Sequence, residues 1–231
     1  MNPIPDIPIL FEDAVLLAVN KPAGLAVHHT PDPSEPNLQC LLEARFSRHL
    51  LLFHRLDRDT TGVVLLGKDR AIAPTMLARF ATHRIRKCYW AVVSGRWDKR
   101  WNRVETGIQK GARGGWETSD SPQAPQHALT TFHVLAQNDE KSWIEALPKT
   151  GRPHQIRLHC HFQGCPILGD TRYGTALDQP MALHAYRLDL RHPVTQTPLS
   201  IIARPPTYWH THLDGLTIKP ALQTYFNASD G

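Results

Sequence analysis

The sequence predicts a sheet-rich globular domain. Runs of β-favouring apolar residues recur along the chain, and in 127–135 and 142–147 they alternate with polar residues at the two-residue period of a strand. Apolar stripes at helical spacing are fewer and shorter. The 231 residues, 41% hydrophobic and 20% charged, have the composition of a soluble globular protein. We therefore expect one compact domain.

The first third of the chain predicts two short strands, a turn and a helix. Residues 9–12 and 14–19 are the predicted strands, and the Asn-Lys-Pro-Ala-Gly sequence of 20–24 is typical of a turn. A helix is expected from about Asn37, whose side chain is a favourable N-cap. Nothing in these patterns requires a function.

A highly charged stretch, 54–62 (HRLDRDTTG), lies between the apolar runs 50–53 and 63–66. Two carboxylates, two guanidiniums and a histidine within nine residues are too polar for a buried strand. We expect a loop held between two buried ends. A helix should follow at 72–80, with Pro74 in its first turn.

Three interpretations of this loop compete with the one developed below. Asp57 and Asp59 fit the first and third positions of a calcium loop, but Lys68 stands at the twelfth position, where a bidentate carboxylate is needed. Residues 57–61 also have the D-x-D-x-T spacing of haloacid-dehalogenase-type magnesium phosphotransferases, without the paired downstream carboxylates of those enzymes. The third interpretation is a surface turn whose charges neutralise each other.

The middle of the chain contains a basic segment. Residues 84–93 alternate charged and apolar side chains and then become a buried β run. Residues 96–126 are rich in Gly, Pro, Arg and Trp, and we predict a solvated insertion between strands. Its most basic part includes Lys110 and Arg113, and cations interleaved with tryptophans also suit phosphates and stacked bases.

A short helix is predicted between Pro153 and Gly164, with His154, Arg157 and His161 on one face. The histidines and cysteines of this stretch raise the alternative of a zinc site. The guanidinium of Arg157 would repel a metal bound by its two histidine neighbours, which argues against that alternative.

Four stretches, in the same order, resemble the motifs of the RluA-type pseudouridine synthases, which isomerise uridines in ribosomal RNA and tRNA. They are NKPAGLAVH, HRLDRDTTG, K-x-Y-x-A-V-V-x-G and TGRPHQIRLHCHFQGCPILGDTRYG, with Cys165 where histidine is usual. The resemblance covers about 9–206. It implies the pseudouridine synthase fold, an α+β fold with a long mixed, mostly antiparallel sheet, flanking helices and a central active-site cleft.

The same resemblance implies a single catalytic domain over 1–231, with a basic insertion at about 96–126. Many relatives carry an N-terminal S4-like RNA-binding domain. Only about eight residues precede the first predicted strand, so we expect that domain to be missing. The catalytic domain and its insertion must then select the RNA target.

The resemblance also implies roles for individual residues. Asp57 is the catalytic aspartate, Tyr89 stacks against the target base, and Arg157 forms a salt bridge with Asp57 that keeps the acid ionised. Arg55 fills the place that the extruded uridine leaves. The residues expected to contact RNA are His54, Arg55, Lys87, Lys110 and Arg113.

The composition of the chain and the chemistry of the isomerisation limit which cofactors and partners we expect. The isomerisation is redox-neutral and hydrolyses nothing, so we expect no cofactor and no metal. A net charge of +5 favours a polyanionic partner such as RNA. Four cysteines without a C-x-x-C pair, and no apolar run near the roughly 18 residues of a membrane span, favour a cytoplasmic protein, expected to be a monomer. An RNA-binding or assembly protein without turnover remains the alternative.

Overall fold

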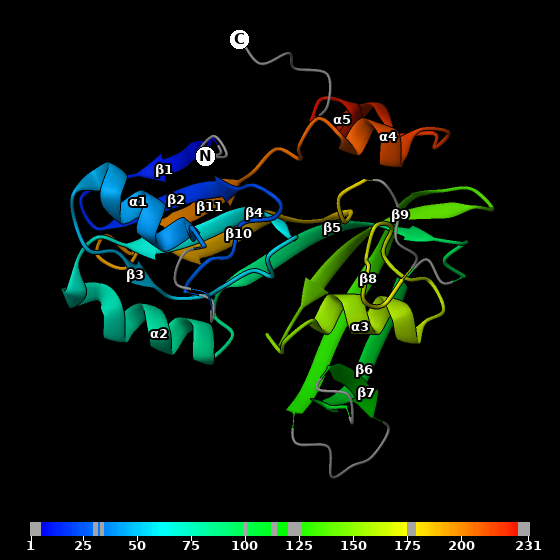
Figure 1. The fold of residues 1–231 in the computed structure, drawn as a ribbon, viewed down its shortest axis with the longest axis horizontal. Helices are drawn as coiled ribbons and strands as arrows, with labels where there is room; N and C mark the ends of the chain where they lie inside the picture. Colours follow the sequence, from blue (N-terminus) through cyan, green and yellow to red (C-terminus); the bar gives the residue numbers. More distant parts are fainter. Residues whose placement is uncertain are drawn as a thin grey trace. The chain divides into compact units, whose positions relative to one another are not determined.

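The computed structural model describes residues 6–29, 32, 35–98, 101–111, 115–119, 126–174 and 179–225. The chain divides into two compact units, shown with their elements in Figure 1. The first unit is Met1–Arg86 with Ala185–Pro206, and the second unit is Lys87–His184 with Thr207–Gly231. The predicted single catalytic domain stays a prediction.

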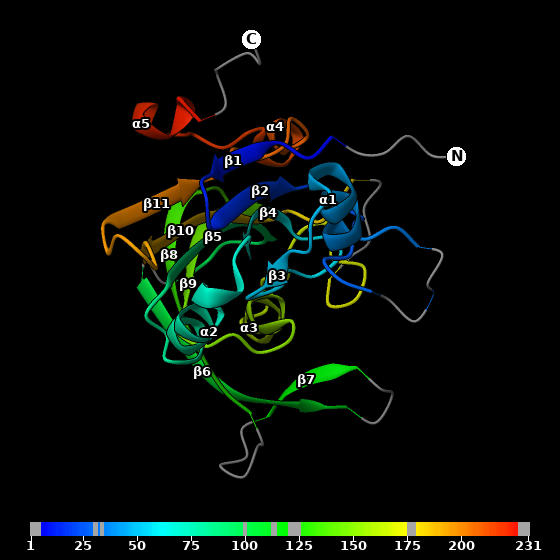
Figure 2. The same cartoon turned by 90° about the vertical axis from the view of Figure 1, so that its left-hand side faces the viewer.

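The first unit is built on a sheet with the strand order β1-β2-β4-β10, in which β3 pairs with β4 and β11 with β10. β1, β2 and β4 run antiparallel, and Figure 2 shows them side by side. β4 is buried along its whole length, as its apolar sequence predicts. The strands are β1 (Ile9–Glu12), β2 (Leu16–Lys21), β3 (Leu51–Leu52), β4 (Thr61–Gly67), β10 (Leu183–Arg191) and β11 (Pro198–Ile202).

Two helices belong to the first unit. α1 (Leu38–Phe46) begins where predicted, because the side chain of Asn37 accepts the N–H of Cys40 at 3.0 Å. α2 (Ala73–Ala81) follows the 3₁₀ turn η1 (Arg70–Ile72) and buries Met76 in the core of the unit. Leu77 is 51% exposed, so it lies outside the buried face of α2.

The second unit contains the strand order β5-β9-β8-β6-β7, with antiparallel neighbours. The strands predicted at 127–135 and 142–147 are confirmed as β8 and β9, which pair with each other. α3 packs Leu158 against Ile108 and Ala128 of the sheet. The elements are β5 (Arg86–Ser94), β6 (Trp101–Lys110), β7 (Trp116–Ser119), β8 (Gln126–Gln137), β9 (Lys141–Pro148), α3 (Gln155–Phe162), α4 (Trp209–Leu213) and α5 (Pro220–Gln223).

The predicted solvated insertion at 96–126 is wrong for its first half. β6 pairs with β8 in continuous register from Trp101 opposite His133 to Ile108 opposite Gln126. Its buried residues alternate with exposed charged ones, so this segment is part of the sheet. Lys110 ends β6 and is exposed, whereas Arg113 lies outside the described residues.

The α+β class is confirmed by these two units of strands and short helices. In the first unit the β1–β2, β2–β4, β3–β4 and β10–β11 pairs are antiparallel, and the bridge between Ala26 and Asn37 is parallel. In the part of the chain that the structure describes, no helix combines the length and the apolar composition needed to cross a membrane.

Candidate active site

Asp57 lies in the first unit on a turn between β3 and β4. Its carbonyl accepts the N–H of Thr60 at 3.2 Å, and its side chain is half-buried. Leu56 and Thr60 on either side are buried. The predicted loop with two buried ends is therefore confirmed, and the buried flanks restrict where the carboxylate can point.

Gly62 ends this loop where the backbone of β10 approaches closely. Its φ is +110°, and a Cβ there would lie 2.3 Å from the carbonyl oxygen of Ala185. The positive φ is strained for any residue with a side chain, and the close contact leaves no space for a Cβ. Glycine at this position lets the Asp57 loop join β4 against β10.

Lys21 joins the Asp57 loop to the turn at 20–25. Its buried ammonium donates hydrogen bonds to three carbonyl oxygens: Pro22 at 2.8 Å, Leu25 at 2.8 Å and Arg58 at 2.7 Å. Burial lowers the pKa of Lys21 to about 7, against the opposing charges of Asp59 and Asp57. The sequence identified this stretch by its turn residues and its resemblance to a family motif, and did not single out Lys21.

Replacing Lys21 by Met should lower the free energy of unfolding by about 2 to 4 kcal/mol, because three carbonyl oxygens lose their shared donor and one of these hydrogen bonds is fully buried. A lysine whose pKa is lower in the folded state penalises folding most at low pH, and the penalty fades as pH rises towards its unfolded pKa. Wild type should therefore gain stability over the variant between pH 7 and about pH 10. Urea unfolding at both pH values measures this, and a constant difference would contradict it.

Two arginines of the loop also reach the preceding turn. Arg55 is exposed, and its Nη1 donates to Nε2 of His28 at 3.2 Å. Arg58 donates from Nε to the carbonyl of Gly24 and pairs with Glu35 at 2.7 Å. The two stretches that resemble the first two family motifs are thus bound together within one unit.

His54, predicted to contact RNA, is built into the packing of the first unit. Its ring stacks on Phe80 with centroids 4.9 Å apart, and its Nε2 accepts the N–H of Leu65 at 2.9 Å. The imidazole thereby fixes the loop to β4. Its contact with RNA stays a prediction.

The second unit carries Tyr89 and Lys87 on β5. Tyr89 is half-buried and lies opposite Ala146 of β9. Lys87 donates from Nζ to the carbonyl of Thr150 at 3.1 Å, and burial lowers its pKa to about 8. Lys87 thus supports the loop that leads into α3, and its predicted contact with RNA stays a prediction.

Arg157 lies on α3, and only 9% of its side chain is exposed. It binds Asp170 side-on, with Nε 2.7 Å from Oδ2 and Nη2 2.8 Å from Oδ1. Sequence reasoning missed Asp170 as its partner, although the Gly-Asp-x-x-Tyr-Gly signal was present. Asp57 lies in the first unit and Arg157 in the second, and their pairing stays a prediction.

The zinc alternative finds no support among the residues that the structure describes, since no three His, Cys, Asp or Glu side chains there are grouped as metal ligands. His159 is hydrogen-bonded to the hydroxyls of Thr130 at 2.9 Å and Thr106 at 3.2 Å. His161 donates to the carbonyl of Tyr173 at 2.6 Å. These imidazoles hold the fold of the second unit.

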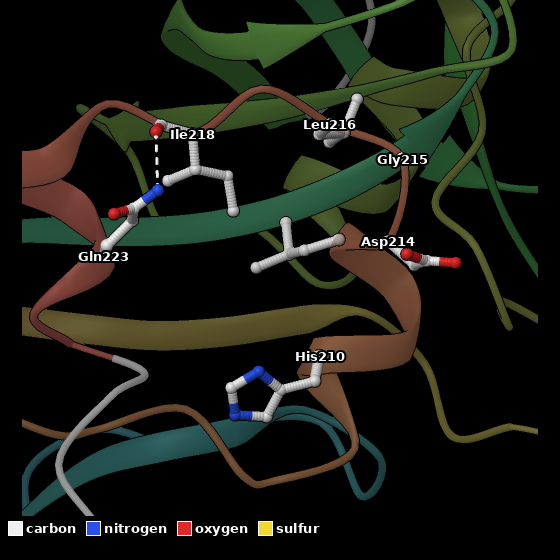
Figure 3. A pocket seen from close by; sticks show the side chains of 7 residues that line it. His210, Asp214, Gly215, Leu216, Ile218 and Gln223 are labelled. Carbon is white, nitrogen blue, oxygen red and sulfur yellow. Dashed lines mark hydrogen bonds between the residues drawn. The ribbon is translucent and has the colours of Figure 1, made fainter.

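A pocket of about 340 Å³ lies in the C-terminal segment of the second unit, where sequence reasoning found no motif (Figure 3). Gln223 closes one side by donating to the carbonyl of Ile218 at 3.1 Å. None of the predicted site residues lines this pocket, whose lining is His210, Leu213, Asp214, Gly215, Leu216, Ile218 and Gln223.

Comparisons with known proteins agree with the sequence motifs. Residues 15–162 match the family described as RNA pseudouridylate synthase. Ribosomal large subunit pseudouridine synthase C of Vibrio vulnificus is 34% identical over 205 residues, which are 84% of this chain and 64% of that protein. tRNA pseudouridine synthase C of Pasteurella multocida is 33% identical over 230 residues, covering 87% of this chain and 92% of the relative.

A solved structure gives the same result for the fold. Human RNA pseudouridylate synthase domain containing 4 is 28% identical, with a TM-score of 0.75 over 91% of this chain and 94% of that chain. The predicted pseudouridine synthase fold is thereby confirmed. Because the family match covers well over half of the residues and includes the Asp57 loop and α3, the chain belongs to the RNA pseudouridylate synthase family of the RluA type.

Proposed function

We propose that this protein is an RNA pseudouridine synthase that isomerises uridine within folded RNA. The observation that carries the proposal is the Asp57 loop, held by Lys21, His54 and Gly62 on a chain that belongs to this family. The names of the two relatives point to ribosomal RNA and tRNA as the substrate class. We further propose that the protein works as a cytoplasmic monomer.

The reaction breaks the C1′–N1 bond of a uridine and joins C1′ to C5 of the same uracil. Asp57 acts as the anionic nucleophile or base in this step. Arg157 keeps the carboxylate ionised, because an opposite charge at contact favours the charged form. The proton that leaves C5 passes to solvent, so neither redox chemistry nor a second substrate is required.

A uridine inside folded RNA must leave its stack before Asp57 can reach it, at a cost of a few kcal/mol. We assign Arg55 to the vacated place and Tyr89 to the face of the extruded base. The exposure of Arg55 on the rim of the Asp57 loop and the half-buried position of Tyr89 on β5 are compatible with these roles. His28, which accepts from Arg55, would orient that guanidinium.

Tritium release from RNA labelled at uridine C5 tests the proposal. An isomerase exchanges that hydrogen when C5 bonds to C1′, whereas a silent RNA-binding protein with the same fold releases none. Pseudouridine mapping in RNA from a deletion strain then identifies the target. A wild-type protein that binds RNA and releases no tritium from total ribosomal RNA or tRNA would overturn the proposal.

Exhaustive treatment with EDTA should leave this activity unchanged, because the proposed reaction uses only side chains. Loss restored by magnesium would favour the phosphotransferase interpretation of residues 57–61, and loss restored by zinc the His/Cys interpretation. The folding of the RNA must be held constant, for example by adding a polyamine to both reactions.

Replacing Lys110 and Arg113 together by Ala should weaken RNA binding and reduce the slope of log affinity against log salt by up to about two. The motivation is the exposed Lys110 at the end of β6, in the basic stretch of the sequence. Binding titrations between low and high salt measure the slope.

Arg103→Ala is the matched control, since Arg103 lies on the same strand and already pairs with Glu105 at 2.8 Å. Its slope should stay close to that of wild type. An unchanged slope in the double variant would mean that neither residue contacts phosphate.

A further inference from the structure

The segment that follows α3 is folded tightly around two glycines. Gly169 has φ +73°, and a Cβ there would lie 2.8 Å from the carbonyl oxygen of Gln179. A Cβ on Gly174 would lie 2.9 Å from the carbonyl oxygen of Ile167. These close approaches fix the backbone between them, which carries Asp170 and Tyr173.

Asp170 is placed by this segment as a fully satisfied buried carboxylate. Its side chain is 0% exposed, and Oδ1 accepts the N–H groups of Arg172 at 3.0 Å and Tyr173 at 3.1 Å. Burial raises the pKa of Asp170. The hydrogen bonds and charge of Arg157 and the hydrogen bonds of these two amides together lower it by more, so the net pKa is below its usual value and the acid stays ionised.

Tyr173 lies under the guanidinium of Arg157, with its ring centroid 5.0 Å from Cζ, in a cation–π contact. Its hydroxyl is hydrogen-bonded to Nδ1 of His154 at 2.7 Å. His154 holds the left-handed conformation with φ +54° at the start of α3, which is strained for a non-glycine residue. The contact with Tyr173 offsets that strain.

We propose that Asp170, Tyr173 and His154 are positioning residues that fix the orientation of the Arg157 guanidinium for the reaction. Asp170 holds the edge formed by Nε and Nη2, and the ring of Tyr173 sets the plane. This inference rests on the proposed function, in which Arg157 keeps the catalytic carboxylate ionised.

The geometry indicates that these residues fix the orientation of the Arg157 guanidinium and do not only balance its charge. A side-on pair of 2.7 and 2.8 Å permits little rotation, whereas a guanidinium held by one contact can swing by more than an ångström at its tip. Errors of that size in a catalytic group reduce rates by about a hundredfold.

The test compares single-turnover rates at saturating enzyme with separately measured RNA affinity. Asp170→Asn keeps the shape and an oxygen for the two amides but removes the charge, and we expect the rate to fall at least a hundredfold with the dissociation constant within about threefold. Tyr173→Phe keeps the ring under Arg157 and loses the bond to His154, and we expect about a tenfold fall.

Thr106→Val is the matched control. It breaks the buried hydrogen bond from β6 to His159, which lies on α3 as Arg157 does, and it leaves the contacts of Arg157 unchanged. Each rate is measured below the onset of thermal unfolding. If Thr106→Val slows the reaction as much as Asp170→Asn at equal stability, the role of Asp170 is merely structural and the proposal fails.

A double-mutant cycle with Arg157→Lys gives a second readout. A lysine cannot form the side-on pair, so Asp170→Asn should slow the Arg157→Lys variant by less than threefold if Asp170 acts through Arg157. Additive losses would overturn the positioning role. An inactive wild type would instead refute the proposed function, so the two failures are distinguishable.

Discussion

Asp57→Asn is expected to reduce tritium release and pseudouridine formation at least about a thousandfold, with RNA affinity within about threefold of wild type. The amide has nearly the same shape as the carboxylate but cannot act as an anionic nucleophile or base. The turn around it should persist, because it is held by backbone and neighbouring contacts, among them the bond from Lys21 to the carbonyl of Arg58 and the buried Leu56.

Asp59→Asn is the matched control for this result. Asp59 lies two residues away on the same loop, is exposed, and has the same chemistry. The isomerase mechanism uses only Asp57, so Asp59→Asn should keep the rate within about threefold, whereas a magnesium phosphotransferase needs both carboxylates. Residual activity of Asp57→Asn within tenfold of wild type would remove Asp57 from the mechanism.

The sequence predicted correctly those elements that depend on residues close to them in the chain. Asn37 caps α1 with its own side chain, and the polar turn between β8 and β9 separates two strands of clear period. β6 was missed because its exposed face carries charges, and its partner β8 begins more than a dozen residues further along the chain. Strand pairing over that distance leaves no mark on the sequence of one strand.

The contacts that hold the site were harder to predict, because they join segments far apart in the chain. Gly62 is required by the backbone of Ala185, and Lys21 binds a carbonyl at Arg58. The partner of Arg157 within its unit is Asp170, and no spacing rule connects these two residues. The family motifs include Lys21, Gly62, Arg157 and Asp170, but only the structure shows which contact each of them makes.

Arg157→Met is the second substitution with a large expected effect, because it leaves the buried carboxylate of Asp170 without its cation. Breaking a buried pair by removing one partner costs about 3 to 5 kcal/mol. In wild type the lowered pKa of Asp170 gives stability that is present at neutral pH and is lost as pH falls through that pKa. Urea unfolding from neutral to acidic pH measures both effects.

The variant should show the opposite trend with pH. Without Arg157, burial raises the pKa of Asp170 above its unfolded value, so the variant is most unstable at neutral pH and recovers as the acid is protonated. Arg157→Met combined with Asp170→Asn removes the buried charge altogether. The double variant should regain most of the lost stability, and its stability should vary less with pH.

Activity separates the structural role of Arg157 from its catalytic one. The double variant should remain at least about a hundredfold slower than wild type although it is folded, because the cation proposed to act on Asp57 is still missing. If keeping Asp57 ionised is the main task of Arg157, part of the rate should return as pH rises, whereas a purely positional role predicts the same loss at every pH. Recovery of activity together with stability would show that Arg157 serves only Asp170, and its pairing with Asp57 would have to be abandoned.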